Sequence, residues 1–133
     1  MIVVDTNVIA YLYFPTKYTP HAEKLLEDNP IWVAPHLWRS EFRNVVALYL
    51  RKELITYEKA LHIQAETESF MGGNEFDIKS INVLSLVNSS ECSAYDCEFV
   101  SLAVNLNTKL YTMDKKVLKE FPNISTSLKD VAC

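Results

Sequence analysis

Glycine is rare in this chain of 133 residues, which contains only two, the adjacent Gly72 and Gly73. A Walker-type phosphate loop and a G-x-G-x-x-G turn each need several spaced glycines, because the backbone there has to approach the phosphates closely. The sequence therefore excludes both of the glycine-rich loops that commonly bind nucleotides.

Cysteine is also rare, and the three cysteines, Cys92, Cys97 and Cys133, are not spaced as C-x-x-C pairs. An odd number without that spacing argues against a disulfide framework and against a zinc knuckle. We interpret them as reduced thiols, which favours a cytoplasmic location.

Long apolar runs are missing as well. The longest ones, such as residues 8–14, are far shorter than the roughly 20 residues that cross a bilayer. The segment Met1 to Asp5 carries no basic side chain and ends in a carboxylate, which is not the pattern of a signal peptide. We therefore expect a protein that is neither secreted nor embedded in a membrane.

The composition is that of a folded globular protein, with 49% hydrophobic residues, 23% charged residues and a formal net charge of −4. No linker, internal repeat or low-complexity segment interrupts the chain. We therefore expect a single domain over residues 1–133.

Short β-branched segments alternate with longer amphipathic segments. The expected strands are residues 2–4, 31–34, 109–112 and 124–126. The expected helices are residues 6–14, 20–27, 37–51, 57–70, 80–88, 94–106 and 115–120, with Thr19 and Thr56 as two of the N-caps. This alternation predicts an α/β fold with a small central parallel sheet flanked by helices on both faces.

Two aspartates stand at the ends of expected strands. Asp5 follows residues 2–4, and Asp114 follows residues 109–112 in the same way. Either carboxylate could cap the helix that begins next, or it could face a ligand beyond the carboxyl end of the sheet. Thr112 lies two residues before Asp114 and would share its face if the strand continues.

Two further acids interrupt apolar helix faces. Leu37 and Val45 lie four residues to either side of Glu41. A buried carboxylate without a partner costs several kcal/mol, so Glu41 either faces a cation or reaches water at a helix edge. Asp96 also shares a face with apolar residues, and its alternative role is a capping box with Ser93.

Taken together, these four acids can converge beyond the edge of the predicted sheet. Their charges would repel one another strongly unless a cation lay between them. A site made only of oxygen ligands favours Mg²⁺ or Mn²⁺ over zinc. Such acidic metal sites typically carry out phosphoryl chemistry.

The order and spacing of four short motifs resemble those of the PIN-domain ribonucleases, especially the small VapC-type toxins. The motifs are Asp5-Thr6-Asn7, Ser40-Glu41 with Asn44, Ala94-Tyr95-Asp96 and Thr112-Met113-Asp114. The resemblance covers essentially the whole chain. It implies that the catalytic and metal-binding residues are Asp5, Glu41, Asp96 and Asp114, with Asn7 and Thr112 as supporting polar residues.

The same resemblance implies an endoribonuclease that cleaves RNA by metal-activated water with Mg²⁺ or Mn²⁺, leaving a 3′-hydroxyl and a 5′-phosphate. Toxins of this type are usually homodimers. An antitoxin protein whose C-terminal segment covers the site neutralises them. RNA is therefore the expected substrate, and an antitoxin and a second copy of the chain are the expected partners.

The chain is acidic, with a pI of about 5.3, whereas nucleic-acid-binding proteins are usually basic. Of the 17 Asp and Glu residues, four are the proposed site acids, and the remaining 13 balance the 13 Lys and Arg residues. Tyr11 and Tyr13 either stack on bases or belong to the core or a dimer contact. Candidate phosphate contacts are Lys17, Arg39, Arg43, Lys115 and Lys116.

Two other functions compete with a ribonuclease. A phosphatase resembling the haloacid-dehalogenase family also begins with a strand that ends in aspartate. That family needs D-x-D, whereas Asn7 stands at the second acidic position, and Glu41 and Asp96 would have no role. The other alternative is a PIN fold without catalysis that serves as an interaction or RNA-binding module.

Overall fold

A five-stranded parallel sheet forms the centre of the computed structural model, which describes residues 1–133. The spatial order of the strands is β3-β2-β1-β4-β5. Their bounds are β1 Ile2–Val4, β2 Trp32–Pro35, β3 Glu75–Phe76, β4 Leu110–Thr112 and β5 Ser125–Ser127. The α/β class with a small parallel sheet is confirmed, and the short β3 at the sheet edge is a strand that the sequence analysis missed.

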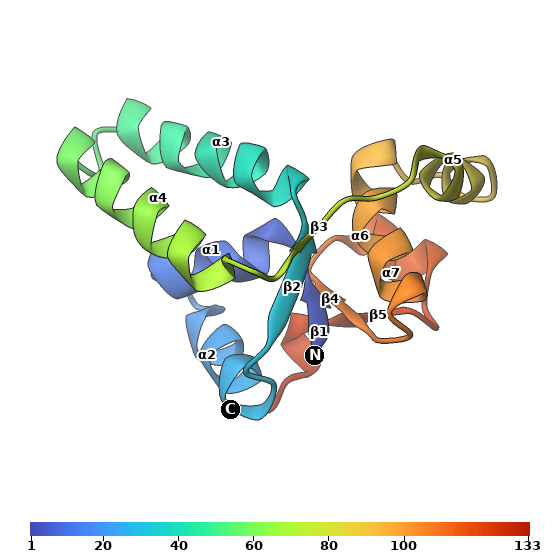
Figure 1. The fold of residues 1–133 in the computed structure, drawn as a ribbon. Helices are drawn as coiled ribbons and strands as arrows, with labels where there is room; N and C mark the ends of the chain where they lie inside the picture. The colour runs from blue at the N-terminus through green and yellow to red at the C-terminus, as the bar shows by residue number, and fades with distance from the viewer.

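Seven α-helices connect the strands, and one 3-10 helix follows β5. Their bounds are α1 Thr6–Tyr13, α2 Thr19–Asp28, α3 Leu37–Arg51, α4 Tyr57–Met71, α5 Ser80–Asn88, α6 Ala94–Asn105, α7 Lys115–Glu120 and η1 Leu128–Asp130. Figure 1 shows α1 to α4 on one side of the sheet and α5 to α7 on the other. Helices therefore flank both faces, as predicted.

The core surrounds β1, whose three residues are all buried. A strand covered by helices on both faces needs apolar residues at every position, and Ile2, Val3 and Val4 meet that need. Trp38 and Phe42 add large buried side chains from α3. No helix combines the length and the apolar character needed to cross a membrane.

The two expected N-caps have different outcomes. Thr56 does cap α4, because its side chain accepts a hydrogen bond from the backbone N–H of Lys59 at 3.1 Å. The cap predicted at Thr19 is wrong, since Tyr18 occupies that position. The Thr19 hydroxyl instead donates to the Tyr11 carbonyl at 2.7 Å, which connects the start of α2 to α1.

Candidate functional site

All four acids predicted from the sequence line one cleft of about 950 Å³. Asp5 directly follows β1, and Asp114 lies two residues beyond the end of β4. Glu41 projects from α3 and Asp96 from the first turn of α6. The cleft therefore lies at the carboxyl edge of the sheet, where parallel α/β folds place their ligands.

The Asp5 carboxylate is fixed by two hydrogen bonds. Its Oδ1 accepts from the backbone N–H of Thr6 at 2.7 Å, and its Oδ2 accepts from the Thr112 hydroxyl at 2.8 Å. Burial raises the pKa of the Asp5 carboxyl, these hydrogen bonds oppose that effect, and the charges of Asp96 and Asp114 add to it. Asp5 thus caps α1 with one oxygen and holds the other beside β4.

Glu41 is held in the cleft by Thr6, a residue that the sequence analysis did not select as functional. The Thr6 hydroxyl donates to Glu41 Oε1 at 2.7 Å, and Thr6 itself is buried. Burial raises the pKa of the Glu41 carboxyl, and the Asp5 charge adds to this. The sequence signals for Thr6 are that it directly follows a strand-end aspartate and that it is part of the Asp5-Thr6-Asn7 motif.

Asp96 and Asp114 begin the two helices on the opposite side of the cleft. The Asp96 backbone N–H donates to the Ser93 side chain at 3.1 Å, as expected at a capped helix start. Burial raises the pKa of the Asp96 carboxyl, and the Asp114 charge raises it further. Asp114 caps α7 by accepting from the Val117 N–H at 2.9 Å. Capping and a place in the cleft are therefore compatible for both residues.

The four acids do not form a tight metal cage. No three Asp, Glu, His or Cys side chains gather closely enough to ligate one ion directly. Mg²⁺ usually keeps several of its waters and uses one or two carboxylates, so a wide cleft with only oxygen donors fits such an ion. Burial and mutual repulsion disfavour the charged forms of Asp5, Glu41 and Asp96, and a cation would relieve both.

The rest of the cleft wall is mixed in character. Of the residues that the sequence analysis selected, Asn7, Lys115 and Lys116 line it. Thr112 does not line it but reaches the Asp5 carboxylate from β4. Residues without an assigned role also face the cleft: Ser40, Asn44, Leu37, Val45, Leu48, Tyr95 and Met113.

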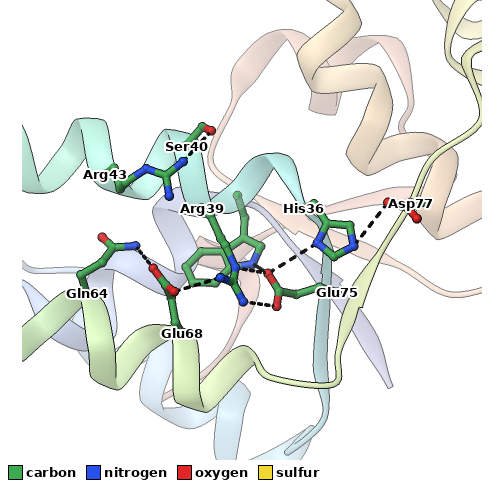
Figure 2. A network of polar contacts seen from close by, with 9 residues as sticks. His36, Arg39, Ser40, Arg43, Gln64, Glu68, Glu75 and Asp77 are labelled. Carbon is green, nitrogen blue, oxygen red and sulfur yellow. Dashed lines mark hydrogen bonds and ion pairs between the residues drawn. The ribbon is translucent and has the colours of Figure 1, made fainter.

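Arg39 lies outside the cleft, in the network drawn in Figure 2. Its guanidinium donates to both Glu75 oxygens, at 2.6 and 2.7 Å, and to Glu68 at 2.9 Å. The Trp38 indole donates to the same Glu75 carboxylate at 2.8 Å. The hydrogen bonds from Arg39 lower the pKa of Glu75. Three N–H donors of Arg39 are therefore used by these carboxylates, so the structure lends no support to the expected phosphate contact of Arg39, which stays a prediction.

Two other basic residues also lie outside the cleft. Arg43 donates to the Ser40 hydroxyl at 3.1 Å on the exposed face of α3. The Lys17 ammonium lies over the Tyr18 ring, 5.3 Å from its centroid. Of the five expected phosphate contacts, only Lys115 and Lys116 line the cleft, and contacts of Arg43 and Lys17 with RNA stay predictions.

Residues 2–123 match the family described as PIN domain. The chain is 26% identical over 140 residues to a Pyrobaculum aerophilum protein named ribonuclease VapC3, covering 94% of this chain and 98% of that protein. The crystal structure of FitAcB from Neisseria gonorrhoeae is similar with a TM-score of 0.72 and 19% identity over 98% of this chain and 99% of that one. A toxin-antitoxin complex from Klebsiella pneumoniae has a TM-score of 0.72 and 16% identity over 96% and 98% of the two chains.

Proposed function

Since this chain belongs to the PIN domain family, we propose that it is a metal-dependent endoribonuclease and the toxin of a toxin-antitoxin pair. The observation that carries the proposal is the gathering of Asp5, Glu41, Asp96 and Asp114 in one cleft at the carboxyl edge of the sheet. A phosphodiester could not approach four carboxylates without a cation, so this arrangement supports a metal ion together with a phosphodiester substrate.

The four acids would hold Mg²⁺ or Mn²⁺, which supplies an activated water and neutralises charge on the phosphate. The chain's own contribution is to keep the carboxylates oriented before substrate arrives. Thr112 fixes one oxygen of Asp5, and Thr6 fixes one oxygen of Glu41. Carboxylates held in place in this way need no reorganisation when the reaction begins.

Three further residues of the cleft are assigned supporting roles. Asn7 offers an amide next to Asp5, and Lys115 and Lys116 offer positive charge next to Asp114. We assign the two lysines to phosphate contacts, because they are exposed, line the cleft and form no ion pair. Lysine binds phosphate as a mobile point charge and therefore suits a substrate that must leave again.

The toxin role draws on the similar proteins, one of which is named as a VapC ribonuclease and another as part of a toxin-antitoxin complex. It implies an antitoxin protein as partner and a homodimer as the assembly. Three unpaired cysteines fit a cytoplasmic location for this system.

Purified protein incubated with Mn²⁺ and either RNA or a phosphate monoester tests the enzymatic proposal. We expect RNA cleavage that leaves 5′-phosphates, is abolished by EDTA and is absent from an Asp5→Asn protein purified in parallel. Cleavage that survives EDTA or the substitution would indicate a contaminant. Hydrolysis of the monoester without RNA cleavage would support the phosphatase alternative.

The toxin role has a separate test. Induced expression in a bacterial host should arrest growth, and co-expression of the protein encoded by an adjacent small reading frame should relieve the arrest. Expression of the Asp5→Asn variant at the same level is the control, and it should be harmless. Growth that is unaffected by the wild-type protein would argue against the toxin role alone.

A further inference from the structure

The seven tyrosines of the chain fall into two groups. Five of them, Tyr11, Tyr13, Tyr18, Tyr49 and Tyr111, pack against the hydrophobic core. Tyr57 and Tyr95 do not, and they are 68% and 64% exposed. Tyr95 is the only tyrosine that lines the cleft of the four acids.

The ring of Tyr95 lacks a partner within the chain. Tyr11 pairs with Tyr18 and Tyr13 with Phe42, at centroid distances of 5.4 and 6.1 Å, but Tyr95 pairs with no aromatic ring. These contacts place Tyr11 and Tyr13 in the core, so they are not the base-stacking residues that the sequence left open. The Tyr95 ring, directly before Asp96 in the sequence, is therefore a large aromatic surface that no other ring covers.

Basic side chains lie near Tyr95 in the same cleft. Lys115 and Lys116 share its cleft, and the same two lysines also line an adjoining hollow of about 430 Å³ together with Lys119, Glu91 and Glu120. Lys116 lies close enough to Asp96, the residue after Tyr95, for its positive charge to lower the pKa of that carboxyl. Three lysines therefore extend from the cleft along α7, and the Glu120 carboxylate in the same hollow accepts from the Glu91 backbone N–H. The lysines are the groups that a phosphate backbone would contact there.

We propose that Tyr95 is the stacking platform for a base next to the cleaved phosphate of single-stranded RNA, with Lys115, Lys116 and Lys119 along the adjoining backbone. The proposal deepens the proposed function and rests on RNA occupying the cleft. Stacking on an exposed aromatic ring requires an unpaired base, because the faces of a paired base are covered by its neighbours in the helix. It accepts any base, since every base has a π-face.

Steady-state cleavage of a short unstructured oligoadenylate RNA with Mn²⁺ tests this role. We expect Tyr95→Ala to lower kcat/KM by about 5- to 150-fold, the range found for loss of one base-aromatic stack. Tyr95→Phe should stay within about twofold of wild type, because the ring is kept. Tyr95→Leu should resemble Tyr95→Ala, because it keeps bulk without a π-face. Tyr57→Ala is the matched control and should have no effect, since Tyr57 is equally exposed but outside the cleft.

A set of oligoadenylates with one abasic nucleotide at successive positions locates the stacked base. Wild-type protein should lose activity at one position, and Tyr95→Ala protein should be insensitive to the same lesion. If wild-type protein cleaves RNA and Tyr95→Ala cleaves it equally well, Tyr95 is not a base contact, and its exposed ring belongs to a protein interface. If wild-type protein neither binds nor cleaves RNA, the proposed function falls and this inference falls with it.

Because Tyr95 is exposed in the first turn of α6, its replacement removes little packing. Alanine is also a better helix former than tyrosine, so the variant should fold. An unfolding curve like that of wild type would show that a change in kcat/KM does not come from a damaged fold.

Discussion

Thr6 joins two parts of the site through a single residue. Its backbone N–H donates to Asp5, and its hydroxyl donates to Glu41, which lies 35 residues further along the chain. Asp5 follows β1 and Glu41 lies in α3, so the spacing of the two acids depends on this bridge. Thr112 plays a similar role between β4 and Asp5.

Replacing Thr6 with valine should therefore impair the site more than the fold. Glu41 would lose its donor, the pKa of Glu41 would rise further, and stability should fall by about 1 kcal/mol. We expect a clear loss of RNA cleavage in Thr6→Val and much less in Thr6→Ser, which keeps the hydroxyl. Serine leaves a methyl-sized gap that also lowers stability, so stability alone would not distinguish the two variants. Their RNA cleavage rates should. Equal activity of both variants would argue against the bridge.

Asp96 should be replaceable by asparagine without loss of the fold. Burial and the Asp114 charge raise the pKa of Asp96, so ionisation of this group opposes folding. The stability that protonated Asp96 contributes is present below its unfolded pKa of about 3.9 and is lost as pH rises through the higher folded value.

Metal-free Asp96→Asn protein should thus equal or exceed wild type in stability at pH 7, and its advantage should shrink toward pH 3. Urea unfolding across this range measures the difference. RNA cleavage should be lost, since the change removes a charge from the cation site. Wild-type cleavage rates in the variant would remove Asp96 from the mechanism.

At the scale of elements, α3 is held on two sides. Arg39 and Trp38 attach it to Glu75 in β3, and Glu41 attaches it to Thr6 in α1. Figure 2 shows the first attachment, in which Glu68 of α4 also takes part. Because Arg39 and Glu41 are two residues apart, they lie on nearly opposite faces of the helix. The two attachments together set the rotation of α3 that points Glu41 into the cleft.

Glu75→Gln should loosen this arrangement, because the Glu75 side chain is only 7% exposed and accepts three hydrogen bonds. We expect a loss of about 1–3 kcal/mol in the free energy of unfolding and a weaker site. Asp28→Asn, which breaks an exposed ion pair with Lys24 within α2, is the control and should change little.

The effect of Glu75→Gln on the free energy of unfolding should also depend on pH. Arg39 lowers the pKa of Glu75, so the stabilisation is present above the unfolded pKa of about 4.3 and is lost as pH falls through the folded value. The stability gap between wild type and Glu75→Gln should therefore narrow below that pH in urea unfolding experiments. A gap that stays constant down to acid unfolding would assign the effect to packing alone.

At the scale of the whole molecule, the cleft joins segments from both halves of the chain. Asp5 caps α1 and Glu41 lies in α3, whereas Asp96 lies in α6 and Asp114 caps α7. Figure 1 shows α1 and α3 on one side of the sheet and α6 and α7 on the other. An ion bound between them would connect the two sides and bind only the folded chain. It should therefore stabilise the fold by an amount that grows with the logarithm of its concentration above the Kd.

We expect Mn²⁺ or Mg²⁺ to raise the Tm of wild-type protein and EDTA to reverse the rise. At a hundred times the Kd the gain is about 2.7 kcal/mol. Asp96→Asn should show a much smaller gain, whereas Asp77→Asn should match wild type, because the Asp77 side chain is 99% exposed and outside the cleft. An equal rise in Tm with metal in all three proteins would indicate that the ion binds outside the cleft.

Local patterns predicted most of the fold. Residues 37–51 and 115–120 form helices with the expected bounds, because amphipathic periodicity and capping residues act over a few positions. The strand β3 escaped prediction, since it has two residues and depends on distant partners. The Ala34 N–H donates to Asn74 next to it, and the His36 N–H donates to Phe76 within it.

The sequence by itself determined the parallel α/β class and the four acids that mark the cleft. Both depend on neighbouring residues, namely apolar strands that end in aspartate and carboxylates on apolar helix faces. Only the tertiary structure decided which polar and aromatic side chains already have partners within the chain. Arg39 meets partners 29 and 36 residues away, whereas the ring of Tyr95 meets none. Pairings over such separations depend on how helices pack against the sheet, and no local pattern records that packing.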